Sequence, residues 1–255
     1  YVSSSAEMRM GNASTVYERM TMYPPSEALQ LQRDAIAAFG WSIDEDRKAV
    51  ESVKEILNDM LDDSDLIWKK LADSLTEARG VTIVGADADA DSLPKQEHER
   101  FIVADGAFAA FTELEPSIIK RVMAIVSDAD GGEGMKQAMR HSHIVWVLHP
   151  HGDNLEEVIG LAQHLRDLER NVVLTHQLEE EMIGAINIGG LTDGDRAACL
   201  ARCVLDASAI KLSGFSIDGI GRWSGQSNPE QKLLKLDWMA RILDSLGLMI
   251  SEPIS

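Results

Sequence analysis

Cysteine, aromatic residues and positive charge are all scarce in this chain of 255 residues. Its two cysteines, Cys199 and Cys203, lie four residues apart, which suits one face of a helix and leaves too few thiols for a zinc site built on cysteine. We therefore expect both to be buried, reduced thiols. Phe, Trp and Tyr make up only 5% of the chain, so an aromatic platform for single-stranded nucleic acid is not expected.

Lysine and arginine number 24 against 42 aspartates and glutamates, which gives a formal net charge of -18. Such a surface repels phosphate backbones and anionic lipid, so neither nucleic acid nor a membrane is an expected partner. The sequence has no apolar run near the roughly 18 residues of a membrane span, and no signal peptide is apparent. We expect a cytoplasmic protein. The sequence leaves the oligomeric state open, and a homo-oligomer is one of the alternatives. An anionic nucleotide would need local cations, which aspartates can hold as metal ions.

The pattern of apolar residues changes near residue 80. Before it, apolar residues recur with helical spacing, and we expect helices over 28–39, from Asp44 onward and over 66–75. Ser26, after Pro24-Pro25, is the expected N-cap of the first helix. Beyond Gly80, short apolar runs alternate with amphipathic stretches at 155–168, 196–205 and 230–246. The runs expected to be strands are Val81–Val84, Phe101–Ala104, Val122–Val126, Ile144–Leu148, Val172–Leu174, Ile183–Ile188 and Ile210–Leu212.

This alternation predicts an α/β fold with a mostly parallel, Rossmann-like sheet and helices on both of its faces. We expect a helical N-terminal region over residues 1–79 and an α/β catalytic domain over residues 80–255.

Four of the expected strands are followed by an aspartate beside a glycine. Ligands of open α/β sheets bind beyond the carboxyl ends of the strands. Carboxylates that converge there repel one another unless a cation lies between them, and their hard oxygens suit Mg²⁺ on nucleotide phosphates. The alternative is that Asp153, Asp193 and Asp195 are helix N-caps. The segments are Asp105-Gly106, Asp128-Ala129-Asp130-Gly131, Gly152-Asp153 and Asp193-Gly194-Asp195.

A further acidic tract runs from Asp87 to Asp91 and resembles a calcium-binding loop. It lacks the glycine of that motif at the sixth position, Ser92, and the glutamate at the twelfth, His98. We interpret the tract as a solvated acidic loop. Histidines flank the fourth strand, and His151 is the one we expect to contact ligand or substrate.

Three blocks resemble the signature blocks of the archaeal 6-hydroxymethyl-7,8-dihydropterin pyrophosphokinases, whose catalytic fold is similar to that of thiamin pyrophosphokinases. The resemblance covers roughly residues 80–245 and extends to the segments 211–216 and 232–236. One departure lies after the first strand, where the family usually has Gly-x-Gly-Pro-Ser-Leu and this chain has Gly85-Ala86 and the acidic tract. The blocks are Ser127-Asp128-Ala129-Asp130-Gly131, His149-Pro150-His151-Gly152-Asp153-Asn154 and Thr192-Asp193-Gly194-Asp195-Arg196-Ala197.

This resemblance implies Mg²⁺-dependent transfer of diphosphate from ATP to a reduced pterin, with release of AMP, in folate or methanopterin-type cofactor biosynthesis. The implied catalytic residues and Mg²⁺ ligands are Asp128, Asp130, Asp153 and Asp193. The implied contacts to substrate are Asp105, His151, Asn154, Asp195, Arg196, Lys232 and Lys235. A thiamin pyrophosphokinase-like or nucleotide-sugar transferase activity, or a non-catalytic nucleotide-binding protein of this fold, remains an alternative.

Overall fold

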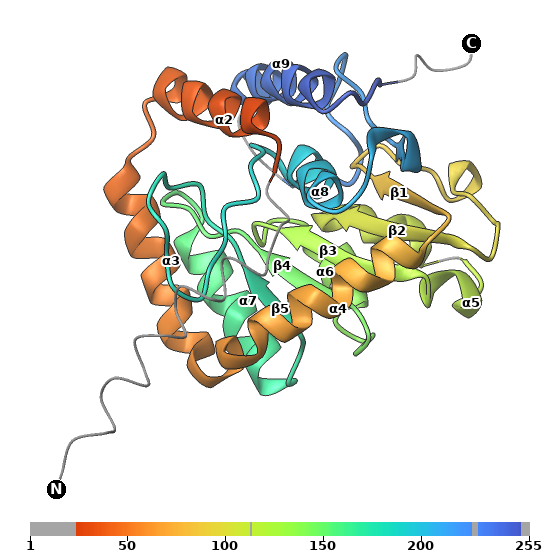
Figure 1. The fold of residues 1–255 in the computed structure, drawn as a ribbon, viewed down its shortest axis with the longest axis horizontal. Coiled ribbons are helices and arrows are strands. Elements are labelled where there is room, and N and C mark those ends of the chain that lie inside the picture. The colour runs from red at the N-terminus through yellow and green to blue at the C-terminus, as the bar shows by residue number, and fades with distance from the viewer. Residues whose placement is uncertain (1–23, 113, 226–228, 251–255) are drawn as a thin grey trace, which may run out of the picture.

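Six parallel strands form one sheet at the centre of the molecule (Figure 1). The computed structural model describes residues 24–112, 114–225 and 229–250. Along the sheet the strands follow the order β5-β4-β3-β2-β1-β6, so the chain crosses the sheet in one direction and then returns to place β6 beside β1. Their bounds are β1 Gly80–Val84, β2 Glu99–Ala104, β3 Val122–Ser127, β4 Val145–Leu148, β5 Val172–Leu174 and β6 Ile210–Ser213.

The predicted α/β fold with a parallel sheet is confirmed, but one predicted strand is wrong. Residues 183–188 make only isolated bridges, Thr175 with Ile186 and Met182 with Ala185. Ile183 is 90% exposed and Gly184 has φ +81°, whereas a parallel strand inside a sheet needs extended backbone and cover on both faces. The segment is therefore an irregular connection between β5 and the next helix.

Eight α-helices surround the sheet in the described part of the chain. The first begins at Ser26 with Pro25 as its N-cap, one residue before the expected cap. α8 begins at Asp193, three residues earlier than its apolar pattern predicts, with Thr192 as N-cap. Their bounds are α2 Ser26–Phe39, α3 Ile43–Leu57, α4 Ser64–Glu77, α5 Pro116–Ile119, α6 Gly132–Ala138, α7 Leu155–Asp167, α8 Asp193–Arg202 and α9 Pro229–Ser245.

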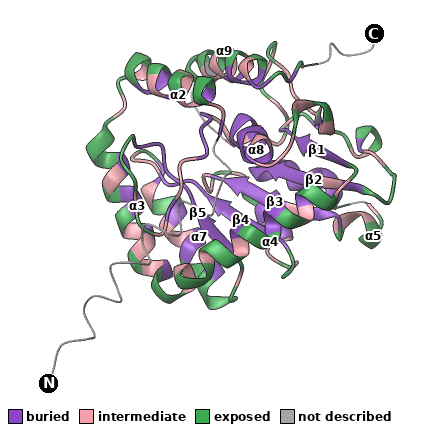
Figure 2. Cartoon of the chain, viewed as in Figure 1, coloured by how far each residue is buried: buried purple, intermediate pink, exposed green. Residues whose placement is uncertain are grey.

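Helices cover both faces of the sheet, as predicted, and the strands between them are buried (Figure 2). Alternate strand residues point to opposite faces, so Ile83 and Ile102 join one core while Val84 and Val103 join the other. The first core also takes apolar residues of α2, α4, α8 and α9. The second takes those of α3, α6 and α7.

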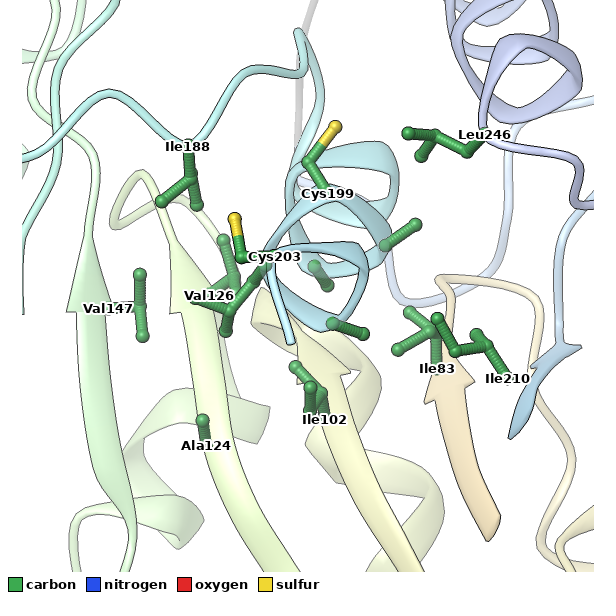
Figure 3. Packing of buried hydrophobic residues seen from close by; sticks show 14 of the residues in the cluster. Ile83, Ile102, Ala124, Val126, Val147, Ile188, Cys199, Cys203, Ile210 and Leu246 are labelled. Carbon is green, nitrogen blue, oxygen red and sulfur yellow. The ribbon is translucent and has the colours of Figure 1, made fainter. Parts of the chain in front are cut away.

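Both cysteines lie in the first core, buried and unpaired, as predicted (Figure 3). Burial raises the pKa of Cys203 to about 12 and that of Cys199 well above its ordinary value. The thiols therefore stay protonated and serve as small apolar residues of this core, Cys199 within α8 and Cys203 at its C-cap.

The N-terminal helices pack directly on the α/β elements: α2 lies beside α9, α3 beside α7, and α4 against β5 and β3 (Figure 1). Because all six strands are parallel, their carboxyl ends share one edge of the sheet. The segments after β1, β2, β3 and β6 and the start of α8 meet there in a single cavity. Within the described ranges, no helix is both long and apolar enough to cross a bilayer.

Candidate active site

A cavity of about 150 Å³ opens at the carboxyl edge of the sheet. Its walls come from the segments after β1, β2, β3 and β6, from the first turn of α8 and from α9. Cavities at this edge are the usual ligand sites of open α/β sheets. The ionisable side chains that line it are Asp105, Asp128, Asp130, Asp193, Lys232 and Lys235, together with Asp87 from the segment after β1 and His151 from the segment after β4.

Three carboxylates of this wall form a cluster, which we call the triad: Asp105, Asp128 and Asp130. One oxygen from each lies within 4.8 Å of the others. The Oγ of Ser127 donates a hydrogen bond of 2.5 Å to Asp105 Oδ1 and accepts one of 3.0 Å from Ala129 N–H. The last residue of β3 thus ties the turn after β2 to the turn after β3.

The backbone bends sharply at both turns. Asp105 has φ +43° and Ala129 has φ +81°, a region that residues other than glycine seldom occupy. A Cβ on Gly131 would overlap the Asp105 carboxylate, and a Cβ on Gly225 would overlap that of Asp130. Strained backbone and close-fitting glycines of this kind concentrate at functional sites, because packing must hold side chains where local preference would not.

The triad concentrates negative charge at the cavity wall, where Asp105 is buried, Asp128 is partly buried and Asp130 is exposed. Burial raises the pKa of Asp105 well above its usual range, and the charge of Asp128 raises it further. The same two causes raise the pKa of Asp130. Burial also raises that of Asp193, with the charges of Asp128, Asp105 and Asp130 adding to it, and this fourth carboxylate lines the same cavity.

Asp128 is held differently, by His151. Burial alone would raise the pKa of Asp128, but a hydrogen bond and the charge of His151 bring it below its ordinary value. His151 Nε2 lies 3.3 Å from Asp128 Oδ2, and Nδ1 contacts Asp153. Although burial works against it, these two carboxylates raise the pKa of His151 to about 9, so the imidazole is charged at neutral pH.

The triad has the donor set of a divalent cation site. Asp128 Oδ1 is buried without a hydrogen-bond partner among the described residues, and two of the three carboxyls resist ionisation. A hard cation would satisfy the free oxygen and remove the mutual repulsion. Mg²⁺ fits these oxygens, and Asp193 faces the same space.

Sequence reasoning placed Asp128, Asp130, Asp153 and Asp193 together as metal ligands, and the structure brings three of them to the cavity wall. Asp153 lies apart, with its side chain 66% exposed and bonded to His151. Asp105, predicted as a substrate contact, lies in the triad, and its contact with substrate stays a prediction. A ligand role for Asp153 stays a prediction.

Asp195 and Arg196 lie beneath the site rather than on its wall. Asp195 is fully buried and accepts hydrogen bonds from the backbone N–H groups of Leu191 and Thr192, which makes it the second half of a capping box on α8. Arg196 is 2% exposed and donates from Nη2 to Gln177 Oε1 at 2.9 Å. The predicted substrate contacts of both residues stay untested, and their hydrogen bonds are structural.

Asn154 and the lysines also have defined places. Asn154 Oδ1 accepts from His151 N–H and its Nδ2 donates to the Asp128 carbonyl, so its amide joins the turns after β3 and β4. Lys232 Nζ donates to the Gly225 carbonyl, and both residues line the cavity. Lys235 lowers the pKa of Asp128 by its charge, and its Nζ lies 5.0 Å from the centroid of the Trp41 ring.

Sequence reasoning missed the contribution of the N-terminal helices and of the segment after β6. Trp41, between α2 and α3, stacks beside His151 with ring centroids 6.3 Å apart. Phe215 and Trp223, after β6, line the cavity. The glycines near this segment were the signal in the sequence that could have pointed to it. A Cβ on Gly85 would lie 2.6 Å from the Gly214 carbonyl oxygen, so the segments after β1 and β6 approach as closely as glycine allows.

Fold and site together define an α/β enzyme of the open parallel-sheet class, with a carboxylate-lined site at the carboxyl edge. No protein-family model matches the chain. Three curated relatives match its sequence, each named 6-hydroxymethyl-7,8-dihydropterin pyrophosphokinase. The one from Pyrococcus furiosus is 32% identical over 224 residues, covering 83% of this chain and 89% of the relative.

The relative from Methanocaldococcus jannaschii is 36% identical over 172 residues, which covers 64% of this chain and 68% of the relative. That from Methanothermobacter thermautotrophicus is 34% identical over 155 residues, or 57% and 62%. The chain belongs to the 6-hydroxymethyl-7,8-dihydropterin pyrophosphokinase family.

Proposed function

We propose that this enzyme transfers diphosphate from ATP to the hydroxymethyl group of 6-hydroxymethyl-7,8-dihydropterin and releases AMP, with Mg²⁺ as its metal. The names of its relatives support the pterin substrate. The observation of this chain that supports the chemistry most strongly is the triad of carboxylates at the carboxyl edge. The product would be an activated pterin for a folate- or methanopterin-type cofactor.

Asp105, Asp128 and Asp130 would hold the cation, and Asp193 is the fourth carboxylate that we propose for it. When bound, Mg²⁺ supplies positive charge against the phosphates and helps to align them. His151 keeps Asp128 ionised, which is the state that a cation requires. We propose that Asp153 acts through His151, because it bonds the other ring nitrogen.

The two lysines supply the positive charge that belongs to the chain itself. Lys232 and Lys235 come from one face of α9, three residues apart, and both line the cavity opposite the triad's turns. In the proposed reaction the pterin hydroxyl oxygen bonds to the β-phosphorus, its proton leaves, and the bond from that phosphorus to the α-phosphate oxygen breaks. Amines near the phosphates stabilise charge on the departing AMP.

The test is turnover by the purified chain with ATP, Mg²⁺ and the reduced pterin, followed by mass spectrometry of the product and assay of AMP. We expect a pterin diphosphate and equimolar AMP, no turnover in excess chelator, and recovery on adding Mg²⁺. Thiamin in place of the pterin is the control substrate. Full turnover with chelator present would contradict the requirement for a metal. AMP release with thiamin but not with the pterin would contradict the pterin as the substrate.

A further inference from the structure

A buried chain of hydrogen bonds joins the N-terminal helices to two parts of the site. Asp46, on α3, is 3% exposed. Its Oδ1 accepts from Gly152 N–H at 2.9 Å and its Oδ2 from Gln177 Nε2 at 2.6 Å. Gln177 is also buried, and its Oε1 accepts from Arg196 Nη2 at 2.9 Å. We call this chain the Asp46 relay.

We propose that Asp46 is a positioning residue for the proposed diphosphate transfer, on which this inference rests. One end of the relay holds Gly152, which lies between His151 and Asp153. The other end holds Arg196, in the same helical turn as Asp193. A single carboxylate outside the cavity thus ties together two segments that carry site residues.

The order of donors and acceptors requires one carboxylate in the relay. The backbone N–H of Gly152 and the guanidinium of Arg196 can only donate, so both ends of the relay are donors. With an amide at Gln177, its oxygen must face Arg196 and its nitrogen must face residue 46. Residue 46 must then accept on both sides, which Asp does and Asn cannot, whichever way its amide is turned.

The turn after β4 also fits tightly against the start of α3. A Cβ on Gly152 would lie 2.6 Å from Glu45 Cβ, so the backbone at this position approaches the helix as only glycine allows. Beside it, the rings of Trp41 and His151 are nearly parallel, with 6° between their planes. The corner between α2 and α3 therefore restrains His151 directly and Asp153 through the adjacent Gly152.

Loss of the relay would leave a buried donor facing a donor and would let the two segments shift. Small displacements of groups that align reactants reduce turnover far more than binding of the nucleotide. For Asp46→Asn we expect kcat to fall by at least about tenfold, because a shift of the two segments misaligns the groups that hold the reactants. The KM for ATP should change less than kcat.

A second substitution can restore the order. In the Asp46→Asn, Gln177→Glu double variant, the new amide on α3 accepts from Gly152 N–H and donates to the new carboxylate, which also accepts from Arg196. The total charge equals that of the wild type. We expect this double variant to recover kcat to within a few-fold of wild type, while Gln177→Glu alone, with two carboxylates face to face, should be impaired.

Asp44→Asn is the matched control, since Asp44 lies on the same helical turn with its side chain 81% exposed and, among the described residues, pairs only with Arg47. Its kcat should equal that of wild type. Hydrogen exchange over residues 149–154 gives a readout that needs no activity: it should quicken in Asp46→Asn and return in the double variant. If this exchange pattern appeared but the wild-type chain did not turn over the pterin, the relay would be supported and the proposed function refuted.

A wild-type kcat and exchange rate in Asp46→Asn would overturn the relay. So would a double variant no better than the Asp46→Asn single variant. If Asp46→Asn fails to fold, an active double variant supports the relay, and an equally unfolded one overturns it.

Discussion

Two acidic regions lie near the same cavity, and they differ in how closely their carboxylates are brought together rather than in composition. In the triad, Asp105 is buried, Asp128 is partly buried and Asp130 is exposed. The tract after β1 carries Asp87, Asp89 and Asp91 within five residues, and all three are exposed. Asp89 forms an ion pair of 2.9 Å with Arg222, whose hydrogen bond lowers its pKa. The triad draws its members from two turns separated by more than twenty residues, and burial with mutual repulsion raises the pKa of two of them.

The comparison teaches that a dense run of aspartates does not by itself make a cation site. Water screens the charges of the tract, so they repel one another weakly and need no cation. In the triad, the turns at Asp105 and Ala129 bring three carboxylates within 4.8 Å of one another, with Asp105 buried and Asp128 partly buried. Substitutions in the two regions should therefore differ greatly in their effect on turnover.

Asp128→Asn should lower turnover by at least about 100-fold. The substitution removes a full negative charge from the triad and exchanges one acceptor oxygen for a donor amide, which costs several kcal/mol where about 1.4 kcal/mol is tenfold in rate. Steady-state kinetics with saturating ATP and pterin measure it. Asp91→Asn, in the tract, is the matched control and should stay within a few-fold of wild type.

An Asp91→Asn variant as inactive as Asp128→Asn would erase the distinction between the two regions. The cation site would then have to be sought in the tract after β1, beside the cavity-lining Asp87.

Asp105→Asn should abolish turnover yet stabilise the metal-free protein at neutral pH. Burial and Asp128 raise the pKa of Asp105. A carboxyl with a raised folded-state pKa stabilises the fold at pH below its unfolded pKa, and that contribution is lost as pH rises through the folded value. Asn at this position keeps an acceptor for Ser127 and tolerates positive φ, but carries no charge.

We expect Tm in chelator at pH 7 to rise by about 2–4 °C, which is roughly 1 kcal/mol for a chain of this size. The gain should shrink as pH falls toward 4, where the wild-type carboxyl is protonated as well. Melting curves at several pH values measure this, and a variant less stable than wild type at pH 7 would count against repulsion in the triad.

Asp89→Asn should have the smallest effect. Its carboxylate and Arg222 are both exposed, and exposed ion pairs contribute little to stability. We expect Tm and kcat to match those of wild type within error. A clear loss of activity would show that Arg222, which also donates to the Ala88 carbonyl, orders the wall of the cavity through this pair.

The sheet was predictable because buried parallel strands read as short apolar runs, and six of the seven predicted strands are present. The seventh, Ile183–Ile188, has the composition of a strand, but Ile183 faces solvent and Gly184 turns the backbone. A run of apolar residues does not reveal whether both of its faces are covered.

The site was predictable only in part. Strand ends located Asp128 and Asp130, because parallel strands bring their carboxyl ends to one edge. Asp193 was placed there by a strand that is absent, and it reaches the cavity as the first residue of α8. The cap made by Asp195 is local, with Thr192 three residues before it, and it was one of the alternatives that the sequence offered. The packing that brings Asp46 against Gly152 depends instead on a contact between distant segments. Periodicity within one segment carries no trace of such contacts.

Calorimetric titration of the metal-free protein with Mg²⁺, without ATP, is the sharpest test of the triad as a cation site. We predict saturable binding in the wild type and in Asp91→Asn, with protons released on binding because a cation displaces them from Asp105 and its neighbours. We predict loss of that binding in Asp105→Asn. Unchanged Mg²⁺ affinity and proton release in Asp105→Asn would contradict the assignment of the cation to the triad.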